Sequence, residues 1–234
     1  WRFTDNTSAS TLNTTKQFAS IGNKLVNYRL ITTEGCISDT LKLITIHPNP
    51  AADFTISGAP FCTDKPVMIQ SSLNDITQWN WDLGNGTRTA VPTFTHQYAS
   101  PGNYTLQLIT ANATGCLSAP YQQNLTIYPM PVVNAGPDTV IRAGTAVTLP
   151  ATVTPAGNYQ YTWMPSTYLS SASVLNPVCT PVFSTQYALL VTETGSGCAV
   201  KDQVLVTAVA GLFIPMGFTP NGDGKNDAWI IPGL

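Results

Sequence analysis

The sequence predicts an all-β protein built of tandem β-sandwiches. Apolar and polar residues alternate with a period of two in many short segments, among them YTLQLIT (104–110), YALLVTE (187–193) and QVLVTAV (203–209). This alternation is typical of strands with one buried face, and the Gly, Pro, Asn and Asp clusters between the segments are typical of turns. No stretch of ten residues has a convincing helical period. We therefore expect strands of about five to seven residues throughout.

A unit of about 80 residues recurs along the chain. QFASIGNKLVNYRLITTEGC (17–36) and QYASPGNYTLQLITANATGC (97–116) share Gln, an aromatic residue, Ala-Ser, Gly-Asn and a final Gly-Cys, and a weaker copy ends at STQYALLVTETGSGC (184–198). The proline-rich segments HPNP (47–50) and YPMP (128–131) follow the final strands and are predicted to be semi-rigid linkers. A unit of this size with seven alternating strands fits an immunoglobulin-like sandwich.

The composition favours an extracellular protein and argues against a nucleic-acid partner. Apolar residues make up 43 % of the chain, but charged residues only 9 %, against about 25 % in an average soluble domain. The net charge is -2, and the ten Lys and Arg residues are scattered rather than gathered into a basic face. The longest apolar run, 208–218, is broken by Gly and Pro and is too short to span a bilayer.

The five cysteines are widely spaced and form no CxxC pair, which argues against zinc and thioredoxin-like chemistry. In a Thr-rich chain of strands, such cysteines favour disulfides and hence an oxidising compartment. They are Cys36, Cys62, Cys116, Cys179 and Cys198.

The middle repeat contains QWNWDLGNGT (78–87), in which two tryptophans stand two residues apart and should face the core together. With HQYASPGNYTLQL (96–108), this stretch resembles the polycystic-kidney-disease (PKD) repeat. That family has the pattern Trp-x-Trp-Asp-Phe-Gly-Asp-Gly, then Tyr, then Pro-Gly-x-Tyr-x-Val. Leu83 and Asn85 depart from it. The match rests on Trp79, Trp81, Asp82, Gly84, Gly86, Tyr98, Pro101, Gly102 and Tyr104.

The resemblance divides the chain into domains. It implies a PKD-like domain at 50–131 and, because WRFTDNT aligns with the tryptophan strand, the C-terminal part of another at 1–49. Residues 132–210 resemble the immunoglobulin-like repeats of Bacteroidota surface proteins, although they lack the Asp-Gly turn. On this division we predict a Cys62–Cys116 disulfide, whose loop of about 54 residues would contribute roughly 4 kcal/mol.

Two further cysteine assignments follow from the same division. Cys179 and Cys198 remain for a disulfide of the third domain. Cys36 is the counterpart of Cys116, and its partner would lie in the part of the first domain that precedes the sequence.

The segment FIPMGFTPNGDGKNDAWII (213–231) resembles the start of the type B C-terminal sorting domain of the type IX secretion system, also called the gliding-motility-associated C-terminal domain. The resemblance implies that residues 211–234 begin this domain and that the chain stops inside it. It also implies export through the periplasm and outer membrane to the cell surface or the medium, with the translocon and outer-membrane shuttle proteins as partners. The matching residues are Pro215, Phe218, Thr219, Pro220, Asn221, Gly222, Asp223, Gly224, Asn226, Asp227 and Trp229.

The same loop allows two physical interpretations, both compatible with a sorting signal. It can be a glycine-rich turn braced by Asx side chains. Alternatively Asn221, Asp223 and Asp227 stand at positions one, three and seven of a calcium loop, although Lys225 occupies position five, where a ligand is expected. Calcium is thus the only cofactor that the sequence suggests.

Two short motifs predict modification. Asp39-Thr40-Leu41 and Asp138-Thr139-Val140 match the Asp-(Ser/Thr)-aliphatic O-glycosylation motif of Bacteroidota, which makes Thr40 and Thr139 candidate sites and chance matches the alternative.

No catalytic constellation stands out, so we predict that the chain is not an enzyme. No Ser or Cys stands in a nucleophile elbow and no carboxylate pair is suggested. The two histidines, His47 and His96, are far apart in the sequence. Core packing or sugar stacking are the alternatives for four aromatic residues, Tyr104, Tyr128, Trp163 and Tyr168.

From these observations we predict that the chain is the C-terminal stalk and secretion-signal region of a large cell-surface adhesin or gliding-motility-associated protein. Its distal target is unknown, with glycans among the candidates. One alternative is the spacer of a secreted polysaccharide-degrading enzyme. Another is a PKD-like module that itself binds glycan or protein.

Overall fold

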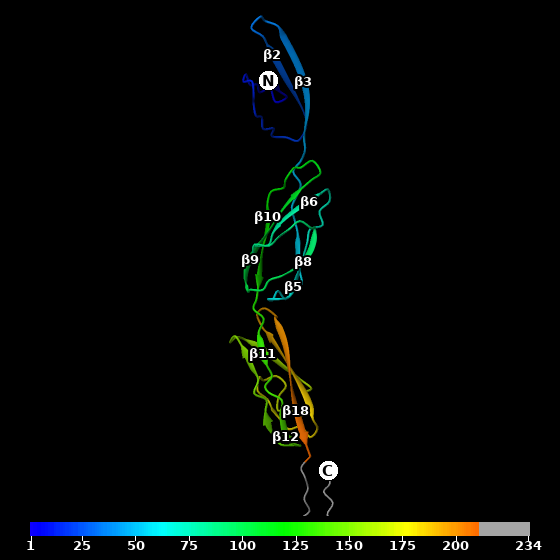
Figure 1. Cartoon of the computed structure of the whole chain (residues 1–234), viewed down its shortest axis with the longest axis vertical. Coiled ribbons are helices and arrows are strands. Elements are labelled where there is room, and N and C mark those ends of the chain that lie inside the picture. The colour runs from blue at the N-terminus through cyan, green and yellow to red at the C-terminus, as the bar shows by residue number, and fades with distance from the viewer. Residues whose placement is uncertain (211–234) are drawn as a thin grey trace, which may run out of the picture. The chain divides into compact units, whose positions relative to one another are not determined.

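Over residues 1–210, the part that the computed structural model describes, the regular structure consists of β-strands without a helix (Figure 1). The prediction of an all-β chain of immunoglobulin-like sandwiches is confirmed. Nothing in this part is a helix that could cross a bilayer. The predicted sorting motif and calcium loop, between Phe218 and Trp229, lie outside the described residues.

The chain forms two compact units, each assembled from several segments. Among the described residues, the first comprises 1–57, 67–96 and 103–125, and the second comprises 58–66, 97–102 and 126–210.

The N-terminal part of the first unit is an antiparallel three-stranded sheet. Its strands are β1 (Arg2–Phe3), β2 (Gly22–Ile31) and β3 (Ile37–Ile46), in that spatial order. Figure 1 shows the long β2–β3 hairpin. Arg29 of β2 lies directly opposite Asp39 of β3, and the guanidinium donates to both carboxylate oxygens at 2.8 Å. This cross-strand ion pair holds the register of the hairpin at its exposed face.

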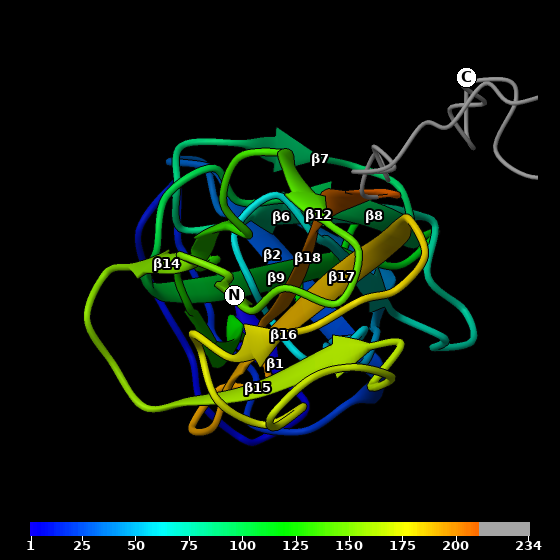
Figure 2. The same ribbon diagram turned by 90° about the horizontal axis from the view of Figure 1, so that it is seen from below.

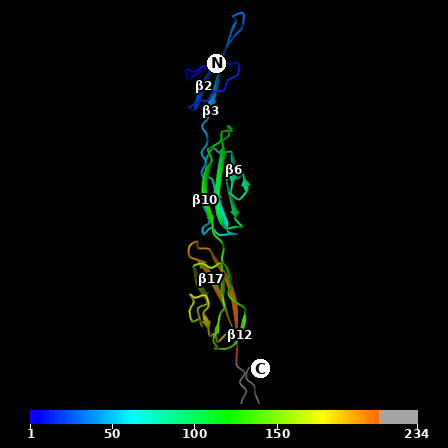
Figure 3. The same cartoon turned by 90° about the vertical axis from the view of Figure 1, so that its left-hand side faces the viewer.

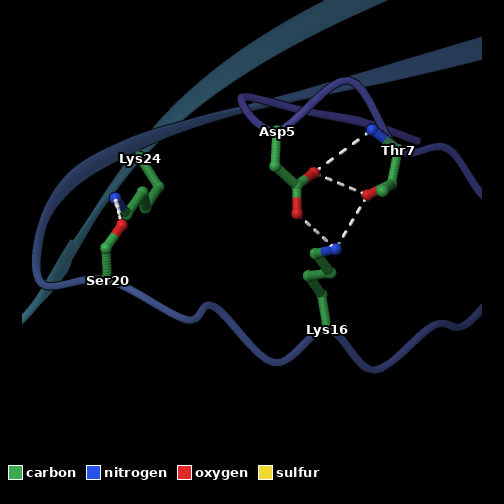
Figure 4. Close-up of polar contacts among 5 residues, drawn as sticks. All are labelled: Asp5, Thr7, Lys16, Ser20 and Lys24. Atoms are coloured by element: carbon green, nitrogen blue, oxygen red, sulfur yellow. Dashed lines mark hydrogen bonds and ion pairs between the residues drawn. The ribbon is translucent and has the colours of Figure 1, made fainter.

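A small polar cluster holds the segment between β1 and β2 (Figure 4). The Asp5 carboxylate accepts a hydrogen bond from the Thr7 hydroxyl at 2.6 Å and lies 2.5 Å from the Lys16 ammonium. Nearby, the Lys24 ammonium donates to the Ser20 hydroxyl at 2.7 Å. These contacts are solvent-exposed.

The cluster predicts an acidic titration for Asp5. The hydrogen bond from Lys16, and then that from Thr7, lower the pKa of the carboxyl from its usual 3.8 to about 2. Because the folded state binds this proton less tightly, the stabilisation is complete above pH 3.8 and is lost as the pH falls through about 2. An NMR titration of the Asp5 carboxyl should show this, and Lys16→Met should return the midpoint toward 3.8. A native midpoint near 3.8 would contradict the assignment.

The remaining strands of the first unit form two sheets (Figure 3). One has the order β4-β5-β8 and the other the order β10-β9-β6-β7. Figure 3 labels β6 and β10 of the second sheet. The strands are β4 (Thr55–Ser57), β5 (Pro66–Gln70), β6 (Gln78–Asp82), β7 (Arg88–Thr89), β8 (Thr93–Gln97), β9 (Gly102–Ala111) and β10 (Tyr121–Ile127).

Alternate side chains of these strands form a buried core. The Trp81 ring lies edge-on to Phe54 at 4.9 Å and to Phe94 at 5.3 Å between ring centroids. Aliphatic side chains fill the rest of the core, as the period-two pattern predicts. The fully buried members include Val67, Ile69, Leu83, Leu106 and Leu108.

The second unit contains a four-stranded sheet in the order β12-β18-β17-β15, with β12 parallel to β18 and the other pairs antiparallel (Figure 2). Two further pairs, β11-β14 and β13-β16, complete it. The core holds Trp163, Tyr187, Leu189, Val204 and Val206. The strands are β11 (Val132–Asn134), β12 (Thr139–Arg142), β13 (Val147–Thr148), β14 (Thr152–Thr154), β15 (Tyr159–Met164), β16 (Val178–Cys179), β17 (Thr185–Glu193) and β18 (Ala199–Val209).

Candidate functional site

Each of the three repeats has one tryptophan whose indole N–H donates to a backbone carbonyl ten or eleven residues later. A buried indole needs such an acceptor, because an unpaired buried N–H is costly. The recurrence relates the third repeat to the other two, although its sequence lacks the Asp-Gly turn. The bonds are Trp1 Nε1 to Thr11 O, Trp81 Nε1 to Val91 O and Trp163 Nε1 to Val174 O, each 3.0 Å.

The two tryptophans of the PKD-like motif differ in burial. Trp81 is completely buried, as predicted, whereas Trp79, two residues earlier on the same face of β6, is half-buried. Trp163 is also completely buried, which leaves it no face for a sugar. Of the other candidate sugar-stacking residues, Tyr128 and Tyr168 are exposed by 43 % and 37 %.

The turn after Trp81 is braced by its own side chains. Asp82 Oδ1 accepts a hydrogen bond from the Gly84 N–H at 2.9 Å, and Asn85 Oδ1 accepts one from the Thr87 N–H at 3.1 Å. The second carboxylate oxygen of Asp82 lies 3.4 Å from the Arg88 guanidinium. These are the Asx contacts of a tight turn, so the polar residues of the motif support the backbone.

Gly84 should be the least replaceable residue of this turn. Its φ is +76°, and a Cβ there would lie 2.8 Å from the Thr105 carbonyl oxygen. Gly84→Ala should cost about 1–3 kcal/mol of stability for the left-handed backbone alone, and more for the clash. Gly86→Ala is the matched control, because Gly86 has a φ of +87° and open space around it. Urea denaturation of both variants measures the difference, and equal losses would mean that the Thr105 backbone gives way.

The second half of the motif lies at the start of β9. Tyr98 is buried, and its backbone carbonyl accepts a hydrogen bond from the Asp64 N–H at 3.0 Å. Pro101 is exposed, Gly102 begins β9, and Tyr104 is half-buried. The motif residues are thus distributed between core and turn and do not converge on one pocket.

The comparison with known families identifies the middle repeat. Residues 49–127 match the family model of the PKD domain. We call these residues the PKD segment. A search of curated proteins finds no match to the chain.

Solved structures give similar but weak results. The PKD1 domain of the Vibrio cholerae metalloprotease PrtV is 25 % identical, covers 35 % of this chain and 99 % of its own, and has a TM-score of 0.30. The PKD1 domain of Vibrio anguillarum Epp is 17 % identical, with 35 % and 96 % coverage and a TM-score of 0.30. A structure of carbohydrate-binding modules from the β-sandwich superfamily is 19 % identical, with 61 % and 54 % coverage and a TM-score of 0.34. At these TM-scores, only the family match carries weight.

The second unit contains a disulfide that joins Cys62 to Cys198, 136 residues apart in sequence, with 5.9 Å between their Cα atoms. The predicted Cys62–Cys116 and Cys179–Cys198 disulfides are therefore wrong, although Cys62 and Cys198 are both half-cystines as expected. Cys36, Cys116 and Cys179 carry free thiols.

The position of Cys116 relative to β10 explains the first correction. The backbone of Cys62 forms a parallel β-bridge with Tyr128, the residue immediately after β10. Cys116 lies before the start of that strand. A strand of seven residues is roughly 24 Å long. Two cysteines at its opposite ends are too far apart, because a disulfide needs Cα atoms within about 7 Å.

The core of the second unit explains the second correction. Cys179 of β16 lies opposite Val147 of β13 in the β-ladder and is completely buried near Tyr187. This burial raises the pKa of its thiol. Tyr187 lies opposite Val204 in the sheet, six residues along β18 from Cys198, or roughly 20 Å. Cys179 therefore acts as a small apolar core residue.

Cys198 occupies the same hairpin position as the unpaired Cys36 and Cys116. In each hairpin the carbonyl of the cysteine accepts a hydrogen bond from a residue at the end of the preceding strand or directly after it. The Gly-Cys that recurs in the sequence thus marks the same hairpin in each repeat. The donors to Cys36, Cys116 and Cys198 are the N–H groups of Thr32, Asn112 and Glu193, at 3.0, 3.2 and 2.9 Å.

A surface depression of about 370 Å³ lies in the second unit and brings Tyr128, Tyr159 and Glu193 together with two prolines. The Tyr159 hydroxyl donates to the Pro155 carbonyl at 2.7 Å. The backbone N–H and hydroxyl of Ser196 both donate to Glu193 Oε2, which lowers the pKa of that carboxyl. Glu193 is therefore a fixed anion at the rim.

The other predicted sites are dispersed. Thr40 is exposed on β3 and Thr139 is half-buried at the start of β12, so their O-glycosylation stays a prediction. The Asp138 carboxylate of the second motif accepts a hydrogen bond from the Leu205 N–H at 2.8 Å. Among residues 1–210, no group of three or more His, Cys, Asp and Glu side chains could hold a metal ion.

Proposed function

We propose that this chain is a spacer: the C-terminal stalk and secretion-signal region of a large cell-surface adhesin or gliding-motility-associated protein. The observation that carries the proposal is the repeated sandwich. The same indole hydrogen bond and the same Gly-Cys hairpin recur in successive repeats. The residues of the PKD motif build core and turn, as expected of a unit selected for shape.

The surface chemistry supports an extracellular location. A disulfide persists in oxidising compartments, and PKD domains and disulfides are typical of extracellular proteins. Uncharged polar side chains make several of the contacts between neighbouring strands. Examples are Thr105 to Asn124 at 2.9 Å, Gln122 to Gln107 at 2.6 Å and Gln186 to Gln203 at 2.7 Å.

Export by the type IX secretion system is supported by the residues between Phe218 and Trp229, which resemble the opening of its type B sorting domain. In this proposal the translocon and its outer-membrane shuttle proteins recognise that domain. The spacer then holds a distal part of the protein away from the membrane.

A secretion assay tests the export step. The native protein and its Asp223→Ala/Asp227→Ala variant would be expressed in a bacterium with type IX secretion and in a translocon mutant. We expect the native protein outside the cell only when the translocon is present, and the variant retained in the periplasm. Release of native protein from the translocon mutant would contradict the proposal.

As an alternative, the same repeated sandwiches and disulfide would serve as the spacer of a secreted polysaccharide-degrading enzyme. The sequence upstream of these repeats separates the two, since one predicts further repeats and the other a catalytic domain with a carboxylate pair.

A glycan-binding role is the second candidate, because Tyr128 and Tyr159 border one depression with the fixed Glu193 carboxylate. Aromatic faces beside a hydrogen-bond acceptor are suited to stack on and orient a sugar ring. Isothermal titration with neutral oligosaccharides tests it, with Tyr128→Ala as the variant and Tyr168→Ala as an exposed control. We expect no binding to the native chain. A binding isotherm abolished by Tyr128→Ala alone would favour the glycan-binding role over a pure spacer.

A further inference from the structure

The Cys62–Cys198 disulfide closes a loop that contains all strands from β5 to β17. Most of the PKD segment and most of the third repeat lie inside this loop. β4 precedes the loop and β18 follows it immediately, beginning at Ala199.

We propose that this disulfide is a tension bypass, which carries a pulling force from Cys62 directly to Cys198 and shields the residues between them. The proposal rests on the proposed spacer function, since a spacer that holds a surface protein in place is pulled at its two ends. Force follows the shortest covalent path. That path spans 5.9 Å between the two Cα atoms, whereas the chain between them, with a sequence separation of 136, could extend to about 490 Å.

Both half-cystines are anchored in hydrogen-bonded structure. On either side of Cys62, the Thr63 N–H donates to the Tyr128 carbonyl and the Tyr128 N–H donates to the Phe61 carbonyl, each at 2.9 Å. The Cys198 N–H donates to the Ser196 hydroxyl at 3.1 Å. Force entering through either cysteine therefore reaches paired backbone rather than a loose loop.

The bond is also protected from reduction. Cys62 is 1 % exposed and Cys198 is completely buried. Reduction requires an attacking thiolate to reach one of the sulfur atoms, so burial slows it. The bypass thus stays closed while the sandwiches remain folded.

The strand that follows the disulfide, β18, can lengthen little under tension. β18 runs for 11 residues from Ala199 to Val209, paired with β17 on one side and with β12 on the other. A strand already rises by about 3.3 Å per residue, close to the limit of an extended chain. Pulling β18 out of the sheet would therefore gain almost no extension, so the force has little tendency to open the third repeat.

Single-molecule force spectroscopy of the full chain, held by protein handles at its two ends, tests the bypass. We expect the fully unfolded chain to be about 490 Å shorter without reductant than with it. This is the extended length of the bypassed chain, whose two cysteines are 136 positions apart. The wild-type chain serves in both conditions, so the comparison does not depend on whether a cysteine variant folds.

Two variants make the result specific. Cys198→Ser should reach the full extension without reductant, and Cys116→Ser should keep the difference of about 490 Å. A difference of roughly 190 Å, the length of a Cys62–Cys116 loop, would overturn the proposal, as would no difference. These lengths do not depend on export, so failure of the secretion assay and failure of the bypass are separate outcomes.

Discussion

Replacing Cys198 by serine should lower the free energy of unfolding of the second unit by up to about 5 kcal/mol. The disulfide closes a loop of 136 residues, and the entropy that it removes from the unfolded chain grows with the logarithm of loop length. This loss is large, because a domain of this kind has a net stability of about 5–15 kcal/mol. Denaturation in guanidinium chloride without reductant measures it, and reduction of the native chain should produce the same loss.

Cys116→Ser is the matched control for this prediction. Cys116 lies in an equivalent Gly-Cys hairpin but is unpaired and only half-buried. Its replacement should therefore change stability by about 0.5 kcal/mol or less. A loss from Cys116→Ser as large as that from Cys198→Ser would mean that the cysteines pair differently in solution.

The fold class could be predicted because its signals are local. A strand with one buried face places an apolar residue at every second position, and this pattern is visible in β9, β17 and β18 without any knowledge of the partners. The PKD motif is also local, since Asp82 braces the N–H of Gly84 two residues away.

The disulfide could not be predicted in the same way, because pairing depends on which residues meet in space. Assigning both Cys62 and Cys116 to one repeat made them natural partners. In the structure, residues 58–66 belong to the second compact unit, with Cys198. There the backbone of Cys62 forms a β-bridge with Tyr128, which places Cys62 beside the 128–131 linker and far from Cys116.

For Trp163 the sequence left core packing and sugar stacking as alternatives, and the structure places it in the core. The third repeat has no Asp-Gly turn after its tryptophan strand, so the motif that marks Trp81 is absent there. What recurs is the sequence separation between the tryptophan and the residue whose carbonyl accepts its indole N–H. This separation is eleven residues in the third repeat and ten in the others. A search for a tryptophan in a strand, followed by a turn of this length, would have found it.

Trp81→Ala should lower the free energy of unfolding of the PKD segment by about 3–5 kcal/mol. The side chain is completely buried and contacts the rings of Phe54 and Phe94. Its removal leaves a large cavity between the two sheets and takes the hydrogen-bond donor away from the Val91 carbonyl. Urea denaturation followed by circular dichroism measures the loss.

Two further variants separate packing from hydrogen bonding. Trp81→Phe keeps an aromatic ring but removes the N–H, so the Val91 carbonyl loses its partner at a cost of about 1–3 kcal/mol. Trp79→Ala removes an equally large side chain from the same face of β6, but from a half-buried position. If Trp79→Ala were as damaging as Trp81→Ala, burial would not explain the effect. A smaller loss from Trp79→Ala, with Trp81→Phe intermediate, would assign the stability of the repeat to the buried indole and its bond across the turn.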